Sequence, residues 1–299
     1  MFSSKKLHQL PLHLMVIPGV ILTFIFSYVP MFGIIMAFQK FVPAKGFFES
    51  KWVGLDNFRY VFAMPNITSV IWNTIFIAVM KIVAGLVIPI LFSLLLNEVR
   101  NNTYKRSIQT IIYFPHFLSW VILGGILIDI LSPSSGIVNQ FLGALGIDPI
   151  YFLGNDKWFP FTLVVTDTWR NFGYNTIIYL AALTGIDPSL YEAATVDGAN
   201  RWKQTIHVTL PGIAPIVCLM TVLSLGNVLN AGFEQTFNLY SPQVYSSGDI
   251  IDTLVYRIGM VEAQFSVATA IGLFKSIISF VLIVLSNKLA NKYAGYRVF

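Results

Sequence analysis

Six segments of the chain are long and apolar enough to cross a lipid bilayer, whose hydrocarbon core of about 30 Å takes about 20 helical residues. Prolines interrupt several of them, which is tolerated where neighbouring helices satisfy the freed carbonyls, so a multi-helix bundle is favoured. The sequence predicts an all-α, polytopic membrane protein whose 299 residues form a single integral membrane domain. Its six transmembrane helices are placed at approximately Leu12–Phe38, Val70–Leu96, Ile108–Leu131, Phe161–Leu183, Gly212–Phe233 and Val267–Ser286.

The composition supports lipid as the solvent. Hydrophobic residues make up 56% of the chain and charged residues only 11%, whereas an average soluble domain is about 25% charged. The net charge of +5 is attributed to loops that set topology, and no nucleic-acid partner is expected. The first apolar run is much longer than the 7–15-residue core of a typical signal peptide, so we expect it to be a retained helix.

The distribution of Lys and Arg predicts the orientation, because cytoplasmic loops carry an excess of both. With both termini inside, the inner segments hold ten of these residues and the outer loops six. The bias is moderate, and an even number of helices agrees with an N-in/C-in topology. The polar segment at residues 185–211 then faces the cytoplasm.

The sequence lacks the motifs of a membrane enzyme. It contains no G-x-x-x-x-G-K-[ST] and no G-x-S-x-G, so neither a phosphate-binding loop nor a nucleophile elbow is expected. The four histidines do not have metal-ligand spacing. We therefore expect no catalytic residues, no bound metal and no cofactor held by this chain.

A polar stripe interrupts the predicted helix at 161–183. Asp167 and Arg170 lie three residues apart, on one helical face, as a possible ion pair. Asn171 and Asn175 extend the stripe. It is interpreted either as a hydrophilic wall along a substrate path or as a paired structural charge near the outer end of the helix, because buried charge is costly in a membrane.

Four further residues are candidates for the same substrate path. Trp169 and Tyr174 could stack on a sugar-like ring, although Trp169 could equally anchor the helix at the membrane interface. Lys81 and Lys275 lie deep inside their predicted helices. A water-filled cavity would explain both lysines, and so would a wrongly placed helix boundary.

The segment at 185–211 reads as two short helices joined at Gly198. Asp187 is a suitable N-cap and Pro188 suits the first helical position. A face of small residues follows, which favours docking into a groove on another protein over lying on lipid. That face consists of Leu190, Ala193, Ala194 and Asp197.

This segment resembles the cytoplasmic EAA loop of permease subunits of binding-protein-dependent ABC importers. The family pattern is E-A-A, three residues, G, nine residues, and I-x-L-P. Val208 replaces the usual isoleucine, and the matching residues are Glu192, Ala193, Ala194, Gly198, Leu210 and Pro211, with Asp197 completing a common D-G-A form. The resemblance implies that Glu192 contacts an ATPase subunit and that Gly198 lets the chain turn.

The resemblance also implies the other subunits of the transporter. It predicts a type I importer fold in a prokaryotic plasma or inner membrane, a second and non-identical permease, two ATPase subunits that bind ATP and Mg²⁺, and an extracytoplasmic solute-binding protein. The C-terminal segment looks most like the carbohydrate-uptake branch, with an oligosaccharide or polysaccharide fragment as substrate, and an acidic sugar remains open. The alternative is the same machine for an amino acid, a peptide or an anion.

Overall fold

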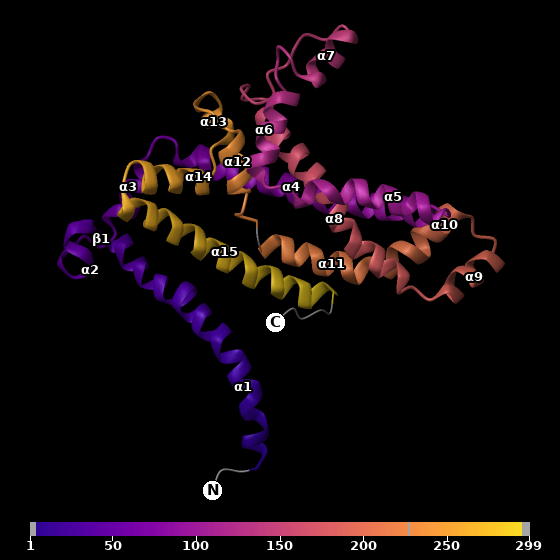
Figure 1. Cartoon of the computed structure of the whole chain (residues 1–299), viewed down its shortest axis with the longest axis horizontal. Coiled ribbons are helices and arrows are strands. Elements are labelled where there is room, and N and C mark those ends of the chain that lie inside the picture. The colour runs from indigo at the N-terminus through magenta and orange to yellow at the C-terminus, as the bar shows by residue number, and fades with distance from the viewer. Residues whose placement is uncertain (1–3, 227, 295–299) are drawn as a thin grey trace. The chain divides into compact units, whose positions relative to one another are not determined.

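The computed structural model describes residues 4–226 and 228–294, and in these residues the chain is almost entirely helical, as predicted (Figure 1). The strands in these ranges form one small antiparallel pair, β1 (Gln39–Lys40) with β2 (Lys51–Trp52), and turns and irregular segments connect the other elements. The chain contacts divide into two compact units. One comprises Met1–Met64 and Val255–Phe274, and the other comprises Pro65–Leu254 and Lys275–Phe299.

The first unit begins with a long apolar helical rod. It consists of α1 (Ser4–Thr23), the π-helical turn η1 (Phe24–Tyr28) and the 3₁₀ segment η2 (Val29–Phe38). An aromatic contact and two hydrogen bonds then hold the loop that follows. Phe38 stacks on Trp52, and the Asn57 side-chain amide donates to two backbone carbonyls. The unit also contains η3 (Pro43–Lys45), α2 (Gly46–Glu49), α3 (Asp56–Ala63) and η7 (Arg257–Val261).

The second unit is built on the pair α4 (Ile67–Glu98) and α8 (Phe159–Thr184), which pack along each other. Its apolar core includes the fully buried Ile77, Leu123 and Phe159. The remaining elements are α5 (Asn102–Tyr113), η4 (Phe114–Phe117), α6 (Trp120–Ile130), α7 (Ile137–Ala144), α9 (Pro188–Val196), α10 (Arg201–Gln204), η5 (Thr205–Thr209), α11 (Leu210–Gly226), α12 (Phe233–Leu239), η6 (Pro242–Val244) and α13 (Tyr245–Gly248). Two helices, α14 (Ile251–Tyr256) and α15 (Phe265–Ala294), contribute residues to both units.

Four helices in the described ranges are long and apolar enough to cross a membrane: His13–Phe38, Ile67–Glu98, Arg201–Gly226 and Phe265–Lys288. The bent pair Asn102–Phe117 and Trp120–Ile130 makes a fifth if it counts as one span. The remaining predicted helix, Phe161–Leu183, is present as α8. Its 26 residues give a length of about 39 Å, but its polar stripe lowers its hydropathy.

The predicted helix at Ile108–Leu131 is broken in the structure. The first half is α5 continued by η4, and the second half is α6. The chain bends by 105° between them. Pro115 cannot donate a backbone hydrogen bond, and Ser119 starts a new helix because its hydroxyl accepts from the Ile122 N–H. The sequence contains both signals, but neither specifies a bend of this size.

The predicted helix at Gly212–Phe233 also differs. It begins earlier, since α10, η5 and α11 form one helix over Arg201–Gly226, and it ends at Gly226. Residues 228–232 are non-helical, and Gly232, whose φ of +92° lies outside the right-handed helical region, directly precedes α12. The segment between α11 and α15 contains a series of short helices, α12, η6, α13, α14 and η7.

Candidate functional site

A cavity of about 510 Å³ lies in the second unit, between α4, α8, α11 and the non-helical chain before α12. Apolar walls come from residues such as Ile82, Phe172 and Met220. The polar lining consists of Lys81, Asp167, Thr168, Asn171, Asn175, Ser224 and Asn230. Four of the residues expected along a substrate path, Lys81, Asp167, Asn171 and Asn175, therefore lie together.

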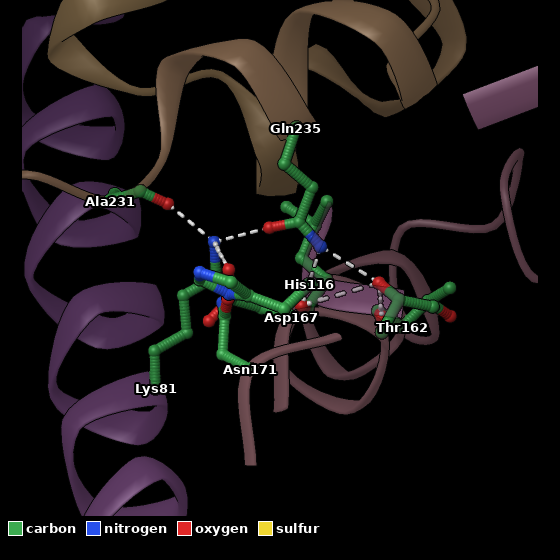
Figure 2. Close-up of polar contacts among 9 residues, drawn as sticks. Lys81, His116, Thr162, Asp167, Asn171, Ala231 and Gln235 are labelled. Carbon is green, nitrogen blue, oxygen red and sulfur yellow. Dashed lines mark hydrogen bonds and ion pairs between the residues drawn. The ribbon is translucent and has the colours of Figure 1, made fainter. Parts of the chain in front are cut away.

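Lys81 is the central cation of this cavity. Its side chain is 9% exposed, and its ammonium donates to the Ala231 carbonyl oxygen over 2.6 Å and to the side-chain oxygen of Gln235 (Figure 2). Asp167 Oδ1 lies 3.9 Å from the same nitrogen. A buried ammonium needs such partners, because an unpaired one is too costly in an apolar interior. Lys81 in turn satisfies a carbonyl freed by the break after α11.

Gln235 is a site residue that the sequence analysis missed. Its side chain is fully buried, and its amide nitrogen donates to the Leu163 carbonyl over 2.8 Å and to Thr166 Oγ1 over 2.7 Å. The amide thus links α12 to α8 while its oxygen accepts from Lys81 (Figure 2). Phe233 and Phe237, which stack four residues apart just after Gly232, are the sequence signal for a helix here.

The predicted Asp167–Arg170 ion pair is wrong. Arg170 instead donates to the Leu118 carbonyl over 3.1 and 3.3 Å and to the His116 carbonyl over 3.3 Å. Its guanidinium also lies 4.9 Å above the Trp120 ring. Carbonyls left free by the break between α5 and α6 attract this side chain, and Arg170 is absent from the cavity lining.

The two aromatic candidates are placed outside the cavity lining. Tyr174 stacks on His116 with ring centroids 4.1 Å apart, and His116 Nδ1 lies 3.0 Å from Asn171 Oδ1. Trp169 is 43% exposed. One side of α8 therefore lines the cavity, while Arg170 and Tyr174 secure the broken helix.

Lys275 lies beside the cavity. Its ammonium donates to Asp252 Oδ1 over 2.5 Å and to Asn230 Oδ1 over 2.9 Å. Asn230 is part of the lining, so Lys275 positions a cavity residue. Its charge is paired with Asp252.

The EAA loop (residues 185–211) has the local structure that the sequence predicts. Asp187 caps α9, because its Oδ1 accepts from the Ser189 N–H over 2.9 Å, and this bond lowers the pKa of the Asp187 carboxyl. Pro188 is the first residue of α9. Gly198 has a φ of +77° and joins α9 to the next helix. Glu192, Ala193 and Asp197 are exposed, and Ala194 is half-buried.

Internal hydrogen bonds brace the loop. The Tyr191 hydroxyl lies 3.0 Å from Thr209 Oγ1, and the Gln204 amide donates to Thr195 Oγ1 and to the Ala199 carbonyl. Arg201 forms an ion pair with Glu98, at the C-terminal end of α4. The second helix runs directly into α11, whose first residues are Leu210 and Pro211.

Within residues 4–226 and 228–294, no group of three or more His, Cys, Asp or Glu side chains could hold a metal ion.

The chain belongs to the family of binding-protein-dependent transport system inner membrane components, whose model matches residues 85–294. It is therefore a permease subunit of an ABC importer and not an enzyme. The EAA pattern, the helical fold and the membrane-spanning helices agree with this assignment.

Individual relatives are similar over nearly the whole chain. The polygalacturonan/rhamnogalacturonan transport system permease protein YteP of Bacillus subtilis (strain 168) is 40% identical over 295 residues, covering 99% of this chain and 92% of that protein. A chain of the bacterial alginate ABC transporter, solved with an alginate pentasaccharide-bound periplasmic protein, superposes with a TM-score of 0.89 at 36% identity, covering 97% of each chain. A second structure, of a bacterial ABC transporter involved in the import of the acidic polysaccharide alginate, gives 0.88 at 37% identity and covers 96% of each.

Proposed function

We propose that this chain is one of two non-identical permease subunits of an importer in a prokaryotic plasma or inner membrane, and that the importer carries an acidic oligosaccharide or polysaccharide fragment. The similarity to permeases for polygalacturonan/rhamnogalacturonan and for alginate supports an acidic carbohydrate. The C-terminal segment noted above supports the same branch.

The polar cavity in the second unit is the observation that carries the proposal. Its volume of about 510 Å³ lies in the range of about 300–1,000 Å³ typical of ligand sites. Three asparagine amides and a threonine hydroxyl supply both donors and acceptors, which suits the many hydroxyls of a sugar. An apolar solute would leave these groups unpaired, at a cost in affinity.

In this proposal the EAA loop couples movement of the permease to the ATPase subunits. We place α9 in a groove of a cytoplasmic ATPase subunit, with Glu192 at the contact and with Ala193 and Ala194 keeping the docking face slim. ATP and Mg²⁺ bind to two such partner subunits, and this chain holds neither. ATPase closure moves the permease only if the loop binds differently in the two states, because equal affinity shifts no equilibrium.

Reconstitution of the complete complex in liposomes tests the proposal. The permease pair, both ATPase subunits and the solute-binding protein are assembled, and uptake of labelled trigalacturonate is measured with and without ATP. We expect ATP-dependent uptake of the acidic oligosaccharide. Uptake of an amino acid or a peptide in its place would support the alternative solute class, and full activity in a preparation without any ATPase would refute the proposal.

A further inference from the structure

Lys81 retains bonding capacity toward the cavity. An ammonium has three N–H donors, and two are used by the Ala231 carbonyl and the Gln235 side chain. Asp167 Oδ1, at 3.9 Å, is beyond the distance of a hydrogen bond. One donor is therefore left for a ligand that approaches more closely.

The other cations near the cavity, Arg170 and Lys275, are absent from its lining. The Arg170 guanidinium donates to backbone carbonyls and lies over the Trp120 ring. Lys275 forms an ion pair with Asp252 and a hydrogen bond with Asn230. Among the residues that the structure describes, Lys81 is the one cationic side chain in the cavity lining.

Thr168 adds a second unused polar group. It lines the same cavity and is 7% exposed, and its hydroxyl has no hydrogen-bond partner in the described part of the chain. Buried hydroxyls are almost always paired in folded proteins. An unpaired hydroxyl in the wall of a cavity that also holds an ammonium with a spare donor indicates a place for an oxygen-rich ligand.

The Asp167 carboxylate is loosely held. Its side chain is 25% exposed, and no hydrogen bond from the described residues holds it in place. Figure 2 shows it facing the Lys81 ammonium from α8. A free carboxylate entering the cavity could approach Lys81 more closely than Asp167 does, and Asp167 could then turn toward solvent.

We propose that the cavity binds one carboxylate of a uronate residue on Lys81, and that Asp167 occupies this place in the empty permease as an internal substitute for the substrate carboxylate. This inference rests on the proposed function. Like charges compete for one ammonium, so Asp167 weakens the bound state. The substrate is thereby held firmly enough to enter and weakly enough to leave, as conduction requires.

Paired substrates test the proposal in the reconstituted complex. Trigalacturonate and its methyl ester share one sugar skeleton, and the ester replaces the charge of each carboxyl group by a methyl group. Each is supplied at a concentration that saturates the solute-binding protein. The acid-to-ester ratio of initial uptake rates is measured. We expect Lys81→Met to lower this ratio at least about tenfold, since removing one partner of a buried charge pair costs binding strongly. We expect Asp167→Asn to raise it.

Two further variants separate charge from packing. Lys81→Arg keeps the cation and should keep a ratio above that of Lys81→Met. Gln235→Leu removes a structural partner of Lys81 while leaving its charge, so the overall rate should fall but the preference for the acid should persist.

An unchanged ratio in Lys81→Met, or a lowered ratio in Asp167→Asn, would overturn the inference. If Lys81→Met does not assemble, Asp167→Asn and Lys81→Arg decide the question. A wild-type complex that transports neither trigalacturonate nor its ester would instead contradict the proposed function.

Discussion

Replacing Gly232 by alanine adds only one methyl group, but we expect it to destabilise the protein strongly. Gly232 has a φ of +92°, and a Cβ built there lies 2.7 Å from Lys81 Nζ. A lysine end normally moves away at little cost. This one is held by the Ala231 carbonyl and Gln235, so moving it breaks bonds at the polar centre of the cavity.

The magnitude follows from two terms. An L-residue in the left-handed region costs about 1–2 kcal/mol. Displacing Lys81 weakens its bond to Ala231, and a hydrogen bond to a charged group contributes about 1.5–3 kcal/mol. Together these give a loss of about 2.5–5 kcal/mol in the free energy of unfolding.

Unfolding of the permease pair by SDS in mixed micelles measures this loss. Gly85→Ala is the matched control, because Gly85 lines the same cavity, lies in α4 and has nothing within 4 Å of the added Cβ. We expect Gly85→Ala to be neutral or to stabilise the protein by up to about 1 kcal/mol.

The Lys81→Met variant lacks the ammonium that the added Cβ of Gly232→Ala would meet, so it separates the steric cost from the backbone cost. There Gly232→Ala should cost only the backbone term of about 1–2 kcal/mol. Equal costs in both backgrounds, or a cost below about 1 kcal/mol in the wild type, would refute the reasoning.

Four other substitutions test the remaining features. Glu192→Lys or Gly198→Pro should abolish uptake in proteoliposomes without changing capture by the solute-binding protein, and uptake at the wild-type rate in both would remove the coupling role. Arg170→Met leaves the carbonyls at the broken helix unpaired and should cost about 2–4 kcal/mol in SDS unfolding; a loss within 0.5 kcal/mol, on the order of a surface substitution, would contradict this. Because the Ser189 N–H lowers the pKa of Asp187, the cap is present above the ordinary aspartate pKa of about 3.9 and is lost as the pH falls through the lowered value. Amide hydrogen exchange in α9, corrected for its intrinsic rate, measures this cap. It should accelerate in Asp187→Ala at neutral pH and in the wild type at strongly acidic pH. Equal protection of α9 under all these conditions would argue against the cap.

Local features could be predicted from the sequence. The Asp187 cap, the turn at Gly198 and the two short helices of the EAA loop depend on interactions within a few residues. Apolar length likewise predicted helices at the six positions, because lipid allows few alternatives to a helix.

Distant polar partners could not be predicted. Sequence spacing paired Asp167 with Arg170, but the bend after Pro115 brings carbonyls to Arg170. Lys81 is 154 residues away from Gln235, and no local pattern joins them. The break after Gly226 creates the free carbonyl that Lys81 binds, so the cavity depends on irregular backbone that hydropathy does not detect.

The unbroken helix over Arg201–Gly226 has a mechanical consequence. Its 26 residues form a helix of about 39 Å. Its first 11 residues, Arg201–Pro211, belong to the EAA loop, and its last turns carry the cavity residues Met220, Leu223 and Ser224. Axial displacement at Arg201 is therefore delivered to the cavity wall without a relay of side chains. The helix ends at Gly226, five residues before the Ala231 carbonyl that Lys81 holds, so a push from the loop is expected to strain the anchoring bond of the same cation that lines the cavity.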